Sequence, residues 1–512
     1  MNRTITLWLL AAIVISGVGI RSFQLTARSL WFDEAFSWRL VQFPVNELVS
    51  RDAQDVHPPL YYLLLQLWTR VFGPSLLALR SFSVFFSGVT MATAYLLVSF
   101  GFRSRIAGLL AALFVALSGF QIQYGWEARM YTLGSALALW SSFALLKSVR
   151  SAGVTSLGWW LVYAVAAASF LYTHYYAFFT VAAHALFALG YFIVKTKGRV
   201  GEIIQSSSFW YGLVSAIVIV VLYLPWLPTF ISQNRQVQAS YWIPPIGGWV
   251  IPDTFYRLFF PTSGIPPHDT IIGAVTTVLP MVSVFLASVC LFWLVNRLKQ
   301  NTDAAWLLVL GAFIPFIISV TISLLSDQSL YQDRFFVFAH LFILTIFAAL
   351  AVYLSNKWLR RFAGTLVIIA LAWGSWHYWQ ELRIPEKPGA RQAVADLYAL
   401  RQNNEPILVS SPFIYFSILY YATAEHDSTE PKLYSETGEL SHFSGGPILT
   451  ASDIQGPEVF SSTSASLWIV DTSGFGGQPL KLPAGWRLES ERSYPEVFAH
   501  QGDITIRHYV RL

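Results

Sequence analysis

The chain has 512 residues, of which 55% are hydrophobic, 16% aromatic and only 12% charged. A soluble globular protein carries roughly 25% charged residues, so this composition excludes an ordinary soluble globule and predicts an integral membrane protein. The formal net charge of +5 does not indicate nucleic-acid binding, because the Lys and Arg residues stand in short groups between apolar segments. The single cysteine, Cys290, excludes an intramolecular disulfide.

The first apolar run, from Ile5 to Ile20, follows the basic residue Arg3. This pattern is shared by signal peptides, but no convincing small-residue cleavage site follows it and many further apolar runs do. We therefore expect an uncleaved first transmembrane helix.

Apolar runs long enough to cross a membrane predict about eleven spans. They lie near 4–20, 76–99, 106–122, 131–146, 157–173, 177–194, 208–226, 270–295, 304–325, 335–355 and 362–379. With a cytoplasmic N-terminus, every inner loop holds basic residues, as the positive-inside rule requires: Arg103 and Arg105, Lys147 and Arg150, Lys195 to Arg199, Arg297 and Lys299, and Lys357 to Arg361. The segments 21–75 and 227–269 and the tail from Gln380 then lie on the outer side of a multi-pass cell-membrane protein.

The first outer segment predicts two helices that lie flat on the membrane. The run from Pro58 to Phe72 is interrupted by Gln66 and Arg70, and it follows a His-Pro-Pro turn. Phe43-Pro44 opens a second, amphipathic stretch.

From Gln380 the composition becomes polar, with Pro and Gly punctuation. Helical spacing runs from Ala390 to Arg401, and short β-like runs cover 406–410 and 466–470. A hairpin around Gln501-Gly502-Asp503 is expected within 499–510. The sequence thus predicts an α-helical polytopic domain over 1–379 and a small α/β domain on the outer side over 380–512.

Polar residues gather at the predicted outer ends of the spans. The adjacent carboxylates Asp33 and Glu34 stand among Trp31, Phe32 and Phe36, on what we expect to be an extended segment with the two side chains on opposite sides. We expect one cavity at the outer interface, ringed by Asp33, Glu34, His57, Arg80, Glu127, Arg129, Tyr131, His174 and Arg334. The alternatives are acids that cap an interfacial helix, and helix-end ion pairs for Glu127 with Arg129 and for Asp333 with Arg334.

Histidines give a weaker signal. His184 and His340 lie inside spans, where packing is the favoured interpretation. A divalent metal is a possible cofactor through His57, Glu127, His174 and His268, but no metal-binding spacing connects any two of them.

Three motifs carry a family resemblance: HPPLYYLLLQLWTRVFG from His57, ALRSFS from Ala78, and YGWEARMYTL from Tyr124, preceded by the Asp33-Glu34 pair. With them the chain resembles the polytopic glycosyltransferases of the GT-C fold, which include protein O-mannosyltransferases, lipid A aminoarabinose transferases and lipopolysaccharide galacturonosyl transferases (glycosyltransferase family 39 and its relatives). The resemblance covers about the first 230 residues, and the tail matches only in position.

The resemblance implies an inverting transfer of a sugar from a polyprenyl-phosphate donor to an acceptor hydroxyl of a protein, lipid or glycan on the outer leaflet. It implies Asp33 as the general base, with Glu34 orienting the acceptor or holding a metal. Arg80, Arg129 and Arg334 are then candidates for the donor phosphate, because guanidinium groups bind phosphate oxygens in a bidentate way. His57 and His174 can orient the carboxylate, bind phosphate or ligate a metal.

A lipid or glycan transporter or flippase without transferase activity is the main alternative. Transporters place ionisable residues near the bilayer midplane, whereas here they gather at loop ends. A glycan ligase or polymerase and an inactive scaffold are further alternatives. The sugar, the polyprenyl carrier and the acceptor stay open at this point.

Overall fold

The computed structural model describes residues 2–239, 241–261, 264–402, 405–425, 430–436, 442–461 and 464–512. The chain divides into two compact units. The helical unit contains Met1–Phe23, His57–Tyr61 and Ser81–Tyr378, and the sheet unit contains Gln24–Val56, Tyr62–Arg80 and Trp379–Leu512. Most of the first outer segment therefore folds with the tail, which a single boundary after residue 379 did not anticipate.

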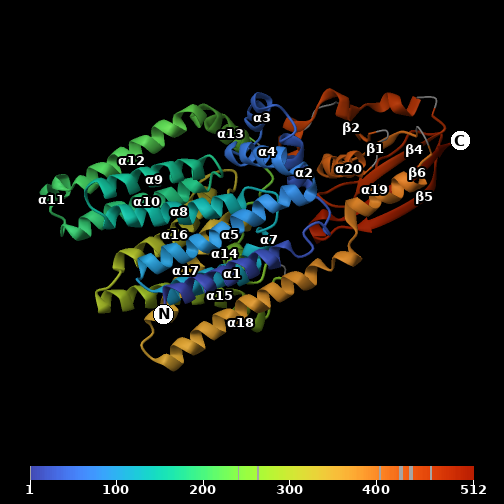
Figure 1. Cartoon of the computed structure of the whole chain (residues 1–512). Coiled ribbons are helices and arrows are strands. Elements are labelled where there is room, and N and C mark those ends of the chain that lie inside the picture. The colour runs from blue at the N-terminus through green and yellow to red at the C-terminus, as the bar shows by residue number, and fades with distance from the viewer. Residues whose placement is uncertain are drawn as a thin grey trace. The chain divides into compact units, whose positions relative to one another are not determined.

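The helical unit is built from long helices joined by short turns (Figure 1). They are α1 (Arg3–Ser22), α5 (Leu76–Gly101), α6 (Arg105–Leu117), α7 (Gly119–Gln123), α8 (Tyr131–Arg150), α9 (Gly153–Leu171), α10 (Ala177–Lys195), α11 (Val200–Gln205), α12 (Ser207–Tyr223), α13 (Leu227–Ala239), α14 (Val250–Phe259), α15 (Ile271–Leu298), α16 (Thr302–Leu325), α17 (Val337–Tyr353) and α18 (Lys357–Leu382). The 3-10 turns η1 (Leu224–Trp226) and η2 (Asp333–Phe336) precede α13 and α17.

Within the described residues, nine helices are long and apolar enough to cross a membrane. Nine of the expected spans coincide with them, and the other two do not. The run at 106–122 divides into α6, with 13 residues, and α7, because Ser118 ends the first helix and its side chain caps the second by accepting from the N–H of Gln121. The run at 362–379 lies within α18, which is not among the nine.

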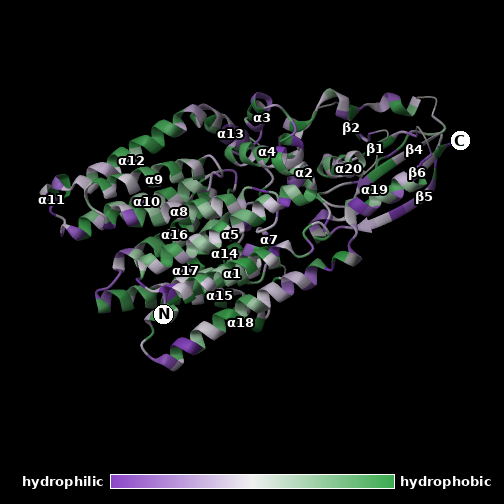
Figure 2. Cartoon of the chain, viewed as in Figure 1, coloured by the Kyte–Doolittle hydropathy of each residue, from purple (hydrophilic) through white to green (hydrophobic). Residues whose placement is uncertain are grey.

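The centre of the helical unit is formed by α8 and by α17 with the turn before it. In the most apolar part of each, 83% and 78% of the residues are buried. In the continuous helical stretch Ser207–Ala239, which begins with α12, the corresponding share is only 22%, and Ile217, Val220 and Val221 are exposed. An exposed apolar face on a helix of this length suits contact with lipid. The two units also differ in hydropathy. Figure 2 shows hydrophobic residues along α9, α10 and α12 of the helical unit and hydrophilic residues along strand β5 of the sheet unit.

The turn between α7 and α8, residues 124–130, carries the sequence YGWEARM. From α5, Ser87 donates to the carbonyl of Gly125 at 3.1 Å and Ser83 to the carbonyl of Glu127 at 2.6 Å. A Cβ on Gly125 would lie 2.5 Å from the carbonyl oxygen of Gln121 and 2.6 Å from Nε of Arg21. The turn therefore requires glycine at this position.

Arg21, at the end of α1, is fully buried beside this turn. Its guanidinium donates to the carbonyls of Val115 at 2.9 Å and Ala116 at 3.1 Å, and to that of Gly17 at 3.0 Å. The first two carbonyls lie in the last turn of α6, where a cation complements the helix dipole. Arg21 thus caps α6 and supports the turn that carries Glu127 and Arg129.

The sheet unit has a six-stranded sheet in the order β3-β2-β1-β4-β6-β5. The strands are β1 (Ile407–Val409), β2 (Lys432–Tyr434), β3 (Ile454–Gln455), β4 (Ser466–Thr472), β5 (Trp486–Pro495) and β6 (Asp503–Arg511). The first four in spatial order are parallel, whereas β6 runs antiparallel to β4 and to β5. The helices α19 (Gly389–Leu400) and α20 (Pro412–Glu425) pack together and against these strands.

An apolar core forms on the sheet from Leu408, Val459, Phe460, Leu467 and Ile469. All residues of β1, and all residues of β4 after Ser466, are buried, as in a sheet covered on both faces. This pattern explains why such short strands are stable here.

The first outer segment joins the tail through three helices, α2 (Phe32–Leu40), α3 (Val45–Asp52) and α4 (Leu60–Phe72). Trp38 of α2 packs edge to face on Tyr420 of α20 at 5.2 Å, and Arg51 of α3 donates to the carbonyls of Pro447 and Leu449. Gln66 of α4 donates to the carbonyls of Val41 and Phe43. The polar residue that interrupts the apolar run of α4 is therefore a structural hydrogen-bond donor.

The predicted helices that begin after Phe43 and after Pro59 are confirmed as α3 and α4, and the helix from Ala390 as α19. The predicted strands at 406–410 and 466–470 are confirmed as β1 and β4. A hairpin is present around Gln501 and Gly502, but its first strand is β5, so the expected bounds of 499–510 are wrong. Residues Ala499–Gln501 form a 3-10 turn, and β6 pairs with the earlier strand β5, with Pro495 opposite Asp503.

We predict that Gly125→Ala destabilises the protein, because the new methyl group meets a backbone carbonyl that cannot move independently. Overpacking of this kind costs about 1–3 kcal/mol. Thermal unfolding of the purified protein in detergent measures the effect as a lower midpoint. Gly158→Ala in α9 is the matched control, since nothing lies within 4 Å of its Cβ position. Equal midpoints for the two variants would contradict the proposed packing of this turn.

Candidate functional site

Asp33 and Glu34 lie in the first turn of α2, which begins at Phe32. The extended segment expected here is therefore wrong. Carboxylates in a first helical turn are favoured by the unpaired N–H groups and the helix dipole, which explains why the helix starts at this point. The two side chains diverge by about 100° around the helix axis, and Asp33 is half-buried whereas Glu34 is fully buried.

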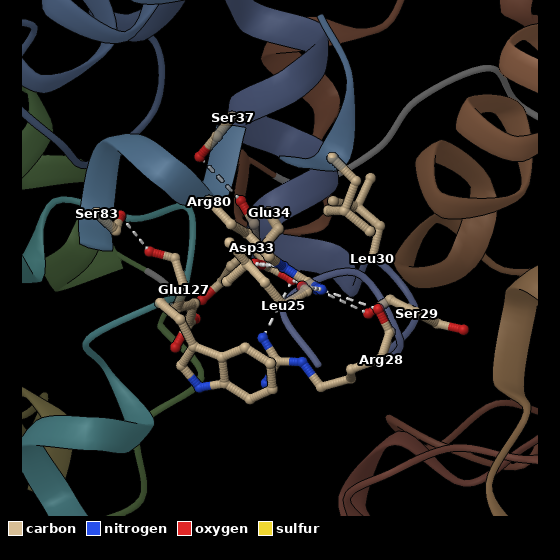
Figure 3. Close-up of polar contacts among 12 residues, drawn as sticks. Leu25, Arg28, Ser29, Leu30, Asp33, Glu34, Ser37, Arg80, Ser83 and Glu127 are labelled. Atoms are coloured by element: carbon tan, nitrogen blue, oxygen red, sulfur yellow. Dashed lines mark hydrogen bonds and ion pairs between the residues drawn. The ribbon is translucent and has the colours of Figure 1, made fainter. Parts of the chain in front are cut away.

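Glu34 accepts from two arginines (Figure 3). Nε of Arg80 lies 2.8 Å from Oε1 of Glu34, and Nη2 lies 2.6 Å from Oε2, which is the bidentate geometry of a strong ion pair. Arg28 adds a contact of 3.3 Å to Oε2. The side chains of Glu34 and Arg80 are both completely shielded from solvent.

Arg80 uses its remaining N–H groups on backbone carbonyls. Nη1 donates to Leu25 and Arg28, and Nη2 donates to Ser29. A guanidinium has five N–H groups, and the contacts to Glu34 and these carbonyls employ all of them. This geometry argues against the expected contact of Arg80 with a donor phosphate and assigns the residue to holding the 25–34 segment.

In the helical unit, His57 and Arg129 are joined directly. Nη2 of Arg129 lies 3.1 Å from Nε2 of His57. A guanidinium only donates, so Nε2 of His57 accepts and the neutral ring carries its proton on Nδ1. Glu127 and Arg129 are both buried, with the N–H of Arg129 donating to the carbonyl of Glu127 at 2.7 Å.

His174 lies between α9 and α10, next to the same group. Burial, followed by the nearby His57, Arg129 and Arg334, holds the pKa of His174 well below its usual value, so the ring is neutral at pH 7. Nδ1 accepts from the N–H of Tyr176 at 3.1 Å, so the proton is on Nε2. His174 therefore offers a neutral N–H donor beside two guanidinium groups.

Tyr124 and Tyr131 complete this cluster. Their rings are 4.9 Å apart, and the ring of Tyr131 lies 6.1 Å from that of His174. Burial, with contributions from Tyr131, Glu127 and Asp333 that exceed the opposing one from Arg334, raises the pKa of Tyr124 well above its usual value. Tyr124 is thus a neutral phenol among the predicted site residues.

Arg334 lies in η2, with its guanidinium 5.1 Å from the ring centre of Trp242. Its neighbour Asp333 accepts from Thr254 at 2.5 Å and pairs with Arg257 at 3.1 Å. Asp333 thus has partners other than Arg334. This observation argues against the alternative in which Arg334 serves only as the ion-pair partner of Asp333.

Six predicted residues therefore gather in the helical unit: His57, Glu127, Arg129, Tyr131, His174 and Arg334. Asp33, Glu34 and Arg80 belong to the sheet unit. That all nine ring one cavity stays a prediction.

Other histidines are engaged elsewhere. His268 contacts Asp253 at 2.9 Å and stacks on Trp249, while His184 contacts Ser142 at 2.8 Å. His340 contacts Gln121 at 3.3 Å. No three His, Cys, Asp or Glu side chains converge as a metal site in the described part of the chain.

Sequence reasoning missed Arg28, and it names Tyr124 only as the first residue of the YGWEARMYTL motif. Arg28 precedes the acidic pair by five residues, and Tyr124 starts the motif that contains Glu127 and Arg129. The closeness in sequence of each residue to a predicted site residue could have indicated it. The contact of Arg28 with Glu34, however, is seen only in the folded structure.

Comparison with protein families matches residues 56–226 to the family described as dolichyl-phosphate-mannose-protein mannosyltransferase. The match includes His57, Arg80 and the turn from Tyr124 to Met130. No curated protein matches the chain.

Several solved structures share the fold. The apo form of ArnT from Cupriavidus metallidurans is 11% identical, with a TM-score of 0.58 over 98% of each chain. The same protein bound to undecaprenyl phosphate is 12% identical, with a TM-score of 0.56 over 99% of this chain and 98% of that one. The archaeal oligosaccharyltransferase AglB from Archaeoglobus fulgidus is 11% identical, with a TM-score of 0.50 over 92% of this chain and 70% of that one.

At these identities the structural likeness establishes the fold, and the motif-bearing segment supplies the match in sequence. Taken together, the helical architecture, the small sheet and the matched segment place this chain in the GT-C superfamily of membrane glycosyltransferases.

Proposed function

We propose that the protein transfers a sugar, with inversion, from a polyprenyl-phosphate donor to an acceptor hydroxyl. The acceptor oxygen forms a bond to the anomeric carbon while the bond from that carbon to the phosphate oxygen breaks. The acceptor proton passes to a carboxylate, and the leaving polyprenyl phosphate keeps the bonding electron pair. This reaction needs a base and a set of cationic or neutral donors for the phosphate.

The carrier is supported by what similar structures hold. The ArnT structure contains undecaprenyl phosphate, and the AglB structure contains a dolichol-phosphate with an inhibitory peptide. Both lipids are polyprenyl phosphates, so we assign this class of carrier to the donor.

The base is Asp33, and the observation that carries this assignment is the unequal environment of the two carboxylates. Both oxygens of Glu34 accept from arginines in a fully buried ion pair. Its neighbour Asp33 is half-buried at the first turn of the same helix. A base must reach the acceptor proton, which favours the partly exposed carboxylate.

Arg129, Arg334 and His174 are assigned to the donor phosphate. They combine two guanidinium groups with a neutral imidazole N–H in one cluster. Charge that develops on the leaving phosphate is stabilised by such preorganised donors. His57, Glu127 and Tyr131 orient this group.

The topology follows the basic loops: the N-terminus lies in the cytoplasm, and the segment 21–75 and the tail lie on the outer side. Acceptors are therefore lipids, proteins or glycans of the outer leaflet and its surroundings.

We predict that Asp33→Asn abolishes transfer without loss of the donor site. Loss of a general base typically costs about 100-fold to 10,000-fold in rate. Release of polyprenyl phosphate by the purified protein gives the rate, and binding of undecaprenyl phosphate gives the integrity of the donor site. Glu47→Gln on α3 is the control, because this carboxylate is exposed and pairs only at the surface with Arg51.

Glu34→Gln should behave differently from Asp33→Asn. It leaves Arg80 as a buried charge with no carboxylate partner, so the unfolding midpoint falls together with the rate. A Glu34→Gln protein that is stable but inactive, beside an active Asp33→Asn protein, would exchange the two roles.

For the phosphate ligands, we predict that Arg129→Lys and Arg334→Lys each weaken undecaprenyl phosphate binding by roughly 10-fold. Lysine keeps the charge but loses the planar fork of donors. Equilibrium binding to the purified protein measures the change, with Arg199→Lys in an exposed pair with Glu202 as the control. Unchanged affinity in both site variants would exclude them as phosphate ligands.

The topology is tested with a single introduced cysteine. With Cys290 replaced by serine, Gln478→Cys in the tail should react with a membrane-impermeant maleimide added to intact cells. Lys197→Cys should react only after the membrane is opened. The reverse pattern would invert the orientation.

A further inference from the structure

The sheet has a topological switch point between β1 and β4. The chain leaves β1 toward β2 on one side, whereas β4 lies on the other side of β1. In open α/β sheets, ligands bind beyond the carboxyl ends of the strands at such a point. Here the chain leaves β1 through Ser410 and Ser411, and it leaves β4 through Ser473, Gly474 and Phe475.

Five rings gather at this end of the sheet: Trp31, Phe32, Phe413, Phe475 and His500, which we call the aromatic edge. Phe475 stacks on Phe413 with centroids 5.1 Å apart and lies 5.8 Å from His500. Trp31 contacts His500 at 6.2 Å, and Phe32 contacts Phe413 at 5.2 Å. The ring contacts thus form a continuous series from Trp31 to Phe32, the two residues that precede Asp33.

Phe475 is displayed at this edge rather than buried. Its side chain is 36% exposed, and its backbone has φ of 53°, a left-handed conformation that bulky residues rarely adopt. Its N–H donates to the carbonyl of His500 at 3.3 Å. The preceding Gly474 is pressed against Gln501, where a Cβ would lie 2.0 Å from the carbonyl oxygen. The close packing fixes Phe475 in an exposed position.

The aromatic edge and the proposed base belong to one compact unit. Trp31 immediately precedes α2, Phe32 is the first residue of the helix, and Asp33 follows. If Asp33 takes the proton of the acceptor hydroxyl, the rest of the acceptor must lie near this end of α2. The aromatic edge is the surface that the tail contributes there.

The chemistry of this surface suits a sugar ring. The faces of aromatic rings carry a negative electrostatic potential, and they attract the weakly positive C–H groups on the flat face of a pyranose. The side chain of Ser473 is exposed, and its Oγ accepts from the N–H of Asp503 at 2.9 Å, so the hydroxyl can still donate its own O–H.

A peptide acceptor would more naturally extend the sheet at one of its two edges, β3 or β5. The edge strand β3 has only two residues and offers little to pair with, which leaves β5. That strand carries Arg487, Glu489, Glu491 and Arg492, and its register is irregular between Leu488 and Ser490. Charges and bulges on an edge strand oppose the addition of another strand.

We propose that the aromatic edge is the acceptor subsite of this enzyme and that its ligand is a sugar ring of a glycan or glycolipid acceptor. This inference rests on the proposed function, because it names the acceptor class of the same transfer.

The test uses the purified full chain and a panel of methyl glycosides and short oligosaccharides as probes. Saturation-transfer NMR should detect contact with the C–H face of at least one glycoside. Phe475→Ala should weaken that binding about 10-fold, as expected for the loss of one stacking partner. Leu488→Ala is the matched control: it is 45% exposed on β5 but pairs with Tyr509, toward the opposite end of the strand from Pro495 and Asp503.

Binding of undecaprenyl phosphate should be equal in wild type, Phe475→Ala and Leu488→Ala, which separates this subsite from the donor site. The inference is overturned if no glycoside binds, if Phe475→Ala binds like wild type, or if a serine- or threonine-containing peptide binds instead and is lost in Phe475→Ala. If Phe475→Ala binds glycosides as wild type does and still releases polyprenyl phosphate, only the subsite is rejected. A wild-type protein that cleaves no polyprenyl-phosphate sugar rejects the proposed function itself.

Discussion

The sheet unit depends on one buried ion pair, between Glu34 and Arg80. Removing two charges from water is costly, and the cost is offset only when the geometry is good and the remaining polar groups are satisfied. Here the contact is bidentate, Arg28 adds a second cation, and the carbonyls of Leu25, Arg28 and Ser29 take the other N–H groups of Arg80. Removing one partner from such a pair costs about 3–5 kcal/mol, which makes the arrangement intolerant of change.

This pair also explains how two adjacent carboxylates acquire different environments. Glu34 is anchored, and the anchor sets the orientation of the first turn of α2. Asp33 lies on the same turn and is half-buried. The two carboxylates therefore differ in burial, and this difference is the basis on which we propose Asp33 as the base.

The helical unit uses a related device around the turn from Tyr124 to Met130. A buried arginine, Arg21, satisfies the end of α6, while Ser83 and Ser87 hold the carbonyls of the turn. Glu127 and Arg129 are thereby fixed at a break between helices rather than on a mobile loop. In both units, buried polar groups hold an irregular segment. In the helical unit this segment carries Glu127 and Arg129, and in the sheet unit it leads into the helix α2 that carries Asp33 and Glu34.

The sequence by itself determined the class of the protein, nine of its spans and the short elements α3, α4, α19, β1 and β4, because these depend on local hydrophobic pattern and on proline positions. It also indicated the residues that gather around Arg129, since the motif spacing places them at span ends. Only the tertiary structure decided that Arg80 binds Glu34 and that the tail folds with the first outer segment. These features depend on contacts between residues far apart in the chain, and the energy of a buried ion pair is set by the partner, which no local pattern specifies.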